Sequence, residues 1–295
     1  MTNGHANAAN VGTVLVGASA WSARSLVHET TWYPRRSMRA ADRMAHYAER
    51  FDLVEIDATA RFPPTADLSR QWVERTPAGF TFDLQGWSLL TGAATMPESL
   101  WEDLHDEIRP EARDARRLYA QHLSADALVE AWRRFRHAVE PLHAAGRLGA
   151  VVLRYPWWLK PGLTARSLLE QARVHLPDLR LAVELPHRRW SEGAQCESTL
   201  SLLEELDLAL VCVDTPDGPG LTAATSELAV VRLVGRNREY APAYRYSSAE
   251  LADWVPRLWS LAGTSEVHVI FANCHLDRAV VNATELSELL AETAR

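Results

Sequence analysis

The stretch LAVELPHRRW, residues 181–190, indicates how this chain folds. Side chains alternate across an extended strand, so Leu181, Val183 and Leu185 fall on one face and Glu184 falls on the other. A carboxylate near the C-terminal end of a buried strand is typical of α/β barrels, which hold their functional groups at that end. The stretch therefore predicts a strand that leads into a functional site.

Seven similar runs lie along the rest of the chain. The eight predicted strands are Val14–Ser19, Leu53–Asp57, Phe80–Gln85, Ala150–Tyr155, Leu181–Leu185, Leu208–Asp214, Ala229–Gly235 and Val267–Asn273. The helical patterns between them are Met38–Arg50, Asp67–Arg75, Ala125–Ala145, Ala165–His175, Ser198–Leu206, Ser248–Ala262 and Thr284–Thr293, with Ser37 and Ser124 as expected N-caps. This alternation predicts an α/β fold, a TIM-like (β/α)8 barrel.

Two segments depart from that regularity. Residues 215–227 are rich in proline and glycine, which predicts an irregular connection after the sixth strand. Residues 92–123 form a charged insertion after the third strand, for which a lid, a solvated helix or a partner surface are all open, with a solvated face as the default. We expect a disordered tail over residues 1–12 and a single barrel domain over residues 13–295.

Composition and charge narrow the function classes. The 295 residues carry 38 acidic and 31 basic side chains, a net charge of −7, which argues against a broadly basic nucleic-acid protein although a local basic patch stays open. No run approaches the length of a membrane span, and the N-terminal residues lack a secretion pattern. The three cysteines form no C-x-x-C pair, as expected in a reducing compartment. We therefore expect a cytoplasmic protein without a membrane partner.

Polar residues gather where the predicted strands face the barrel interior. If the bulky aliphatic side chains face the helices, the interior positions are Glu55, Asp57, Thr81, Asp83, Gln85, Arg154, Glu184, Asp214, Arg232 and Asn273. Layers of Val, Ile and Leu normally fill a barrel interior, so these charges indicate a ligand site at the C-terminal mouth. A structural ion-pair network is the alternative for any single residue.

The loops that follow the strands add aromatic and basic residues. Six tryptophans in these loops would offer stacking platforms for sugars or bases: Trp21, Trp32, Trp87, Trp157, Trp158 and Trp190. Arg236 and Asn237 follow the seventh strand, where many barrels bind phosphate.

These observations predict a role for each candidate site residue. Glu184, Asp214 and Glu55 are the candidate catalytic acid/base groups, and Arg154, Arg232 and Arg236 would bind an anionic part of the ligand. The remaining candidate ligand contacts are Asp57, Gln85, His187, Trp190, Asn237, Asn273, Trp21 and Tyr33. The sequence does not separate acid from base, because burial raises a carboxyl pKa and a neighbouring arginine lowers it.

The histidines and cysteines of the chain allow two other kinds of chemistry, metal binding and thiol catalysis. No cofactor is predicted; a divalent metal stays as an alternative, held by His187 and His275 with carboxylates such as Glu184, Asp57 and Asp214. No H-x-H or H-E-x-x-H spacing supports it, and the arginines compete for the carboxylates. Cys274 beside His275 allows a thiolate nucleophile, but a buried cysteine at a strand end is the favoured interpretation.

Several motifs together resemble one known family. They are VGASAWS (16–22), Trp32-Tyr33-Pro34, YAERFDLVEIDAT (47–59), WVERTPAGFTFDLQ (72–85), GRLGAVVLRYP (146–156), LAVELPHRRW (181–190), RLVGRN (232–237) and VIFANCHLDRAVVNA (269–283). From about Val14 to Leu290 the chain resembles the domain of unknown function 72 family, also called YecE-like proteins. The resemblance implies a TIM-like barrel with no established activity; endonuclease IV and sugar isomerases are analogues at the level of fold only.

The chain also departs from the family pattern. Ala60-Arg61 stands where Phe-Tyr is common, Gln85 where lysine is usual and Gly92 where histidine is frequent; Arg154 and Pro186 replace a common glutamine and an arginine. If the usual lysine and histidine act in chemistry, the resemblance implies an altered specificity or a lost activity. Arg61 and Arg154 restore part of the missing positive charge.

Three functions follow as hypotheses. The leading one is binding and acid/base chemistry on a small polyhydroxylated or phosphorylated ligand at the mouth. The second is a nucleic-acid-binding or endonuclease IV-like protein that takes a flipped or abasic nucleotide, against which the acidic charge and the few mouth histidines count. The third is a non-catalytic ligand sensor that uses residues 92–123 as a contact surface.

Overall fold

Eight parallel strands close into a barrel in the computed structural model, which describes residues 12–19 and 21–293. The barrel strands are β1 (Val14–Ser19), β2 (Leu53–Ile56), β3 (Thr81–Gln85), β4 (Leu148–Arg154), β5 (Leu181–Glu184), β6 (Leu208–Thr215), β8 (Leu228–Leu233) and β9 (Glu266–Phe271). Neighbours along the chain pair in sequence order, β5 with β6 and β9 back to β1. The predicted TIM-like barrel is confirmed; residues 1–11 of the expected tail lie outside the described residues.

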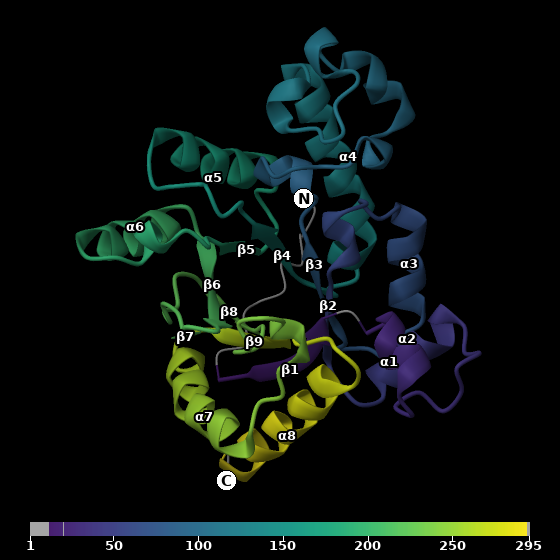
Figure 1. The fold of residues 1–295 in the computed structure, drawn as a ribbon, viewed down its shortest axis with the longest axis vertical. Helices are drawn as coiled ribbons and strands as arrows, with labels where there is room; N and C mark the ends of the chain where they lie inside the picture. The colour runs from purple at the N-terminus through teal and green to yellow at the C-terminus, as the bar shows by residue number, and fades with distance from the viewer. Residues whose placement is uncertain (1–11, 20, 294–295) are drawn as a thin grey trace, which may run out of the picture.

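A ring of helices surrounds the strands (Figure 1). They are α1 (Arg24–Glu29), α2 (Ala40–Ala48), α3 (Ala66–Glu74), α4 (Ala125–Ala144), α5 (Leu163–His175), α6 (Ala194–Glu205), α7 (Ser248–Ala262) and α8 (Arg278–Thr293). None of the helices described is long and apolar enough to cross a bilayer. The sequence analysis missed α1, because a helix of six residues carries little periodicity.

The N-terminal ends of α4 and α2 show the outcome of the two N-cap predictions. Ser124 accepts a hydrogen bond from the backbone N–H of Ala127, as predicted for the N-cap of α4. The N-cap predicted at Ser37 is wrong, because α2 starts at Ala40 after Arg39, without a side-chain cap. The preceding residues form a turn instead, in which the backbone N–H of Met38 donates to the carbonyl of Arg35.

Two apolar layers show which way the strand residues point. A small cluster fills the barrel interior and consists of Ala150, Val152, Ala182, Ala209, Val211, Leu228 and Val230. The larger core lies between the strands and the helices and contains the alternate residues, such as Leu210 on β6 and Phe271 on β9. Every polar residue on a strand can therefore be assigned to the interior or to the helix side.

The barrel wall opens between β5 and β6. These strands pair only from Leu181–Leu208 to Val183–Leu210, while β6 continues to Thr215. Higher up, the short strand β7 (Gly218–Pro219) returns antiparallel against the end of β6. No helix forms between β6 and β8, which confirms the irregular connection predicted over residues 215–227.

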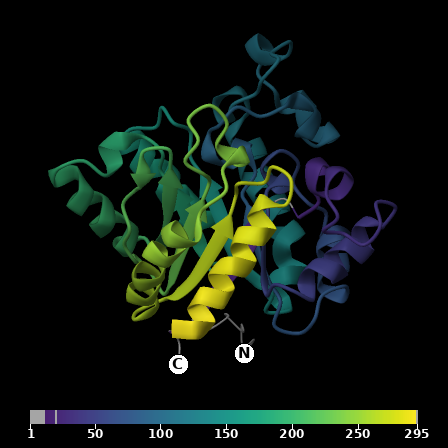
Figure 2. The same cartoon turned by 60° about the horizontal axis from the view of Figure 1, so that its bottom comes forward.

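The insertion over residues 92–123 is built from 3-10 turns. The turns are η3 (Pro97–Ser99), η4 (Glu102–Glu107), η5 (Pro110–Ala112) and η6 (Ala120–His122), after η2 (Ser88–Thr91). Leu104 and Leu118 are buried beneath them, and Arg134 of α4 pairs with Asp103 and lies 5.3 Å over the ring of Trp101. A solvated α-helix is therefore the wrong expectation, since the prolines interrupt it and one side packs on α4. Figure 2 shows the insertion opposite the C-terminal end of α8.

Candidate functional site

A cavity of about 500 Å³ opens at the C-terminal ends of the strands. Its lining comes from the ends of β1 to β4, from β8 and from the segments that follow: Ser19, Asp57, Ala60, Arg61, Gln85, Arg154, Arg232, Val234, Tyr240, Pro242, Ala272 and Cys274. We call it the mouth cavity. Four predicted ligand contacts line it, namely Asp57, Gln85, Arg154 and Arg232.

A chain of ion pairs lies at the base of the mouth cavity. The guanidinium of Arg232 donates to Glu55 from Nε and Nη2, both at 3.0 Å, and to Glu184 from Nη1 at 2.6 Å. Arg154 donates to Glu184 from Nε at 3.1 Å, and the amide of Gln85 donates to Glu55 at 2.9 Å. Two carboxylates and two guanidinium groups thus alternate and balance one another in charge.

The ion pairs set the protonation state of Glu184. Burial alone would raise the pKa of Glu184, but the charges of Arg232 and Arg154 outweigh it and hold this pKa below its usual range. The carboxylate therefore stays ionised and is poorly suited to donate a proton. For Glu55 and Glu184 the geometry agrees with the structural ion-pair alternative more than with the predicted acid/base role.

Asp57 differs from Glu55 and Glu184 in its surroundings. It follows β2, is half-buried and lines the mouth cavity. Burial raises the pKa of Asp57, and the charge of Glu55 raises it further, while Arg61 partly offsets both. Among the described residues, no cation lies within 4.0 Å of the Asp57 carboxylate in an ion pair. Sequence analysis assigned Asp57 a ligand contact, and Asp57 lies in the lining of the cavity, with a raised pKa where that of Glu184 is lowered.

Two arginines of the cavity keep donor groups available. Arg61 is exposed, and within the described part of the chain it forms no ion pair. The side chain of Arg154 is 48% exposed and is bonded to Glu184 through Nε, with no described partner for its terminal nitrogens. Guanidinium groups match carboxylate and phosphate oxygens in geometry, so these donors are of the kind that recognises an anion.

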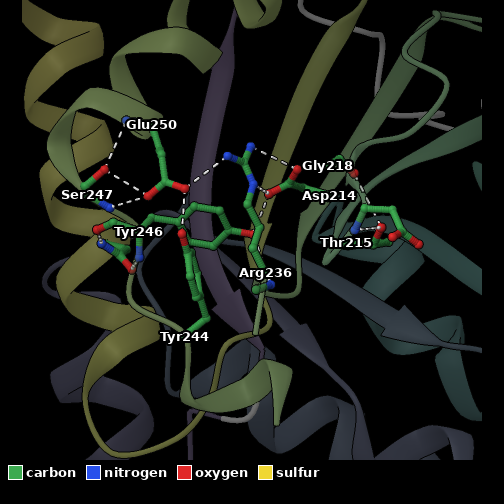
Figure 3. A network of polar contacts seen from close by, with 11 residues as sticks. Asp214, Thr215, Gly218, Arg236, Tyr244, Tyr246, Ser247 and Glu250 are labelled. Carbon is green, nitrogen blue, oxygen red and sulfur yellow. Dashed lines mark hydrogen bonds and ion pairs between the residues drawn. The ribbon is translucent and has the colours of Figure 1, made fainter. Parts of the chain in front are cut away.

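Asp214 does not face the barrel interior, and that prediction is wrong. It lies on the helix side of β6 with Leu210 and Cys212. Its carboxylate accepts from Nε and Nη2 of Arg236 at 2.9 and 3.1 Å and from the hydroxyl of Tyr246 at 2.7 Å (Figure 3). The prediction failed because both faces of β6 are apolar, so the alternation carries no sign of which face is inside.

Asn273 also lies on the helix side. Val267, Val269 and Phe271 precede it at the same spacing and belong to the outer core. Its amide nitrogen donates to the carbonyl of Tyr244 at 2.9 Å and to Asn282 of α8 at 3.1 Å. The predicted interior position of Asn273 is therefore wrong, and a consistent alternation from the valines of β9 would have shown this.

The loop after β8 is not the predicted anion site. Arg236 is held by Asp214 and by Glu250, to which its Nη1 donates at 3.0 Å, and it does not line the mouth cavity (Figure 3). The side-chain oxygen of Asn237 accepts from the backbone N–H groups of Glu239 and Tyr240, which closes the loop on itself. These two predicted ligand contacts have structural partners instead.

Most of the predicted aromatic platforms are packed. Trp21 and Tyr33 are buried together, and the Tyr33 hydroxyl donates to the carbonyl of Trp21 at 2.6 Å. Trp87 is buried and bonded to Ser99, and Trp32 packs partly buried against the outer core, whereas Trp157 and Trp158 are exposed. The tryptophan loops are therefore mainly structural.

Trp190 and His187 line a second cavity beside the first. The indole of Trp190 is buried and donates to the carbonyl of Leu159 at 2.8 Å. The Nδ1 atom of His187 accepts from the backbone N–H of Arg189 at 3.2 Å. Both residues are thus held in place at the wall of a cavity, as a ligand contact requires.

Deeper in the barrel lies a histidine that sequence analysis missed. His268 of β9 is fully buried, with Nδ1 2.9 Å from Asp83 and Nε2 2.8 Å from Glu266, and Arg180 pairs with Glu266 at 2.8 Å. Burial would lower the pKa of His268, but Asp83 and Glu266 outweigh it and raise it. The signal was present, because His268 alternates with Val267 and Val269 on β9.

The described geometry favours neither the metal nor the thiol alternative. Within residues 12–19 and 21–293, no three His, Cys, Asp or Glu side chains form a cluster suited to a metal ion, and Asp214 lies on the opposite strand face from Glu184. Cys274 lines the mouth cavity, and its thiol donates to the carbonyl of Ser19. Burial and the nearby carboxylates Asp57 and Glu55 raise the pKa of Cys274 to about 12, so it stays a thiol at neutral pH.

The fold and this mouth define a parallel α/β barrel with a polar cavity at the C-terminal strand ends. The sequence model described as "Protein of unknown function DUF72" matches residues 15–295, so the chain belongs to that family. It is 24% identical to UPF0759 protein YunF of Bacillus subtilis over 297 residues, which cover 94% of each chain.

Solved structures agree on the fold. A DUF72 family protein from Enterococcus faecalis superposes with a TM-score of 0.73 at 21% identity, over 95% of this chain and 98% of that one. A DUF72 family protein from Thermotoga maritima gives a TM-score of 0.71 at 24% identity, over 95% of this chain and 99% of that one. These likenesses establish the barrel fold; they assign no reaction.

Proposed function

We propose that the mouth cavity binds a small polyhydroxylated or phosphorylated ligand and that Asp57 performs acid/base chemistry on it. One observation carries this proposal. Arg61 and Arg154, whose terminal nitrogens have no described ion-pair partner, share one open cavity with a half-buried carboxylate of raised pKa. Convergent polar groups of this kind in a concave site are what small-ligand enzymes use.

In this proposal the two arginines bind the anionic group of the ligand. They belong to different segments, Arg61 after β2 and Arg154 at the end of β4, so they can approach one group from two sides. Arg232 contributes little net charge, because Glu55 and Glu184 already balance it. It acts instead as the rigid base on which Arg154 and Gln85 are positioned.

The polar part of the ligand would meet Asp57 and Gln85. The amide nitrogen of Gln85 donates to Glu55, which leaves its carbonyl oxygen to accept a hydrogen bond from a ligand hydroxyl. The raised pKa of Asp57 brings its protonation closer to neutral pH, where a carboxyl group can both accept and donate a proton.

A ligand panel tests the proposal. Thermal-shift and calorimetric titrations would compare sugar phosphates with the corresponding free sugars; a ligand at about 100 times its Kd adds roughly 2.7 kcal/mol of apparent stability. Arg61→Ala and Arg154→Gln should weaken phosphate binding, and Asp57→Asn should keep binding but lose turnover. Arg238→Gln is the matched control, because its exposed pair with Asp217 lies outside the mouth cavity. Equal binding by all four variants would refute the arginine site.

The same panel separates the other two functions. An oligonucleotide with an abasic site that binds when sugar phosphates do not, with affinity falling steeply as salt rises, would favour the nucleic-acid function. A ligand that binds tightly and is recovered unchanged, equally with Asp57→Asn and with the unmodified protein, would favour the sensor.

A further inference from the structure

A second cavity opens beside the first, where β5 and β6 separate. Their pairing ends at Val183 and Leu210, after which β5 leads into Pro186 while β6 continues to Thr215. The space between them is a cavity of about 370 Å³ that reaches Thr199 of α6. We call it the β5–β6 slot.

The walls of the slot are mainly apolar. Leu185, Pro186 and Trp190 form one side, and Leu210, Val213 and Leu221 come from the side of β6 and the segment after it. The indole nitrogen of Trp190 already donates to the carbonyl of Leu159, so the ring offers the slot an apolar surface rather than an unmet donor.

The slot and the mouth cavity adjoin at one charged residue. Arg154 and Val234 line both cavities. Glu184 also lines the slot, but Arg232 and Arg154 balance its charge, so it does not prevent an anion from lying nearby. A ligand whose anionic group is bound at Arg154 therefore lies beside an apolar compartment.

We infer that the β5–β6 slot binds an aromatic substituent of the ligand, so that the ligand class is an aryl ester or aryl glycoside that carries an anionic group, rather than a bare sugar phosphate. The inference rests on the proposed function for the place of the anion. The slot itself follows from the separation of β5 and β6. Transfer of an aromatic ring from water into a preformed apolar cavity supplies affinity that a polar mouth lacks.

Calorimetry with four probes tests the slot. The probes are inorganic phosphate, phenyl phosphate, 1-naphthyl phosphate and 1-naphthol, each titrated into the full chain. We expect 1-naphthyl phosphate to bind roughly tenfold or more tightly than inorganic phosphate, because the ring buries apolar surface. Leu221→Trp, which fills the slot from a half-buried position, should abolish that gain and leave inorganic phosphate binding unchanged.

Two further variants distinguish an effect on the slot from a general folding defect. Val213→Phe narrows the slot from β6 and should act as Leu221→Trp does. Val174→Trp near the C-terminal end of α5 is the control, since Val174 is exposed and lies outside both cavities. It should bind every probe as the unmodified protein does.

The possible outcomes test the slot and the proposed anion site separately. Equal affinity for all the phosphates, or an aryl gain that survives both slot variants, overturns the slot while the anion site stands. Binding of 1-naphthol that is lost in the slot variants, without any phosphate binding, supports the slot and overturns the proposed anion site. An absence of binding by all four probes overturns both.

Discussion

Arg232 on β8 spans the barrel interior to reach Glu55 on β2, and its Nε and Nη2 each lie 3.0 Å from a Glu55 oxygen. Because β9 and β1 lie between β8 and β2 in the barrel, this pair ties separate parts of the wall together beneath the mouth cavity. Both side chains are nearly inaccessible to water. The pair therefore forms the base on which the candidate site stands.

Arg232→Met should destabilise the protein by about 3–5 kcal/mol, because it leaves Glu55 and Glu184 buried without their common partner. Denaturant unfolding measures the change. Arg238→Gln serves as the control, because it removes an exposed pair with Asp217 that contributes little. A fully stable Arg232→Met protein would show that the buried carboxylates take up protons or relax toward water.

The buried histidine predicts a pH dependence of stability. Asp83 and Glu266 raise the pKa of folded His268 above its unfolded value of about 6.5, so the stabilisation from the charged ring is complete below about pH 6.5 and is lost as pH rises through the folded pKa. The free energy of unfolding, measured from pH 6 upward, should fall for the unmodified protein relative to His268→Gln. Parallel curves would contradict the raised pKa.

Asp214 should matter for stability and not for ligand binding. Asp214→Asn weakens two charge-assisted hydrogen bonds from Arg236 and should cost about 1.5–3 kcal/mol. Tyr246→Phe removes the remaining bond to Asp214 and also the bond that the hydroxyl accepts from the backbone N–H of Gly235, and should cost about 1–3 kcal/mol. Unfolding and ligand titration would be measured on the same samples. Loss of turnover at unchanged stability would instead restore the catalytic role predicted for Asp214.

The three cysteines should differ in how fast they are alkylated. The pKa of Cys274 is raised to about 12 and that of Cys212 to about 11, in both cases chiefly by burial, so neither forms a thiolate at neutral pH. Alkylation of the native protein with iodoacetamide, followed by peptide mapping, should modify Cys196 first. Rapid modification of Cys274 in the folded protein would revive the nucleophile hypothesis.

The interior positions were predictable where the two faces of a strand differ. Along β5 and β8 the polar residues Glu184 and Arg232 share a face with small or apolar residues of the interior cluster, and the structure places them inside as expected. Strand β6 offers no such contrast, so Asp214 was assigned to the wrong side. Local alternation shows that successive side chains lie on opposite faces of a strand. Only tertiary packing decides which of the two faces lines the barrel interior.

The sequence by itself determined the barrel, the family and the strand ends that carry Asp57, Gln85, Arg154, Glu184 and Arg232. These properties depend on local periodicity and on residue order along the chain. The tertiary structure alone decided that Arg232 pairs with Glu55, that Arg61 enters the mouth cavity and that Arg236 does not. Charge pairing depends on distances between residues far apart in the sequence, and the closure of the barrel sets those distances.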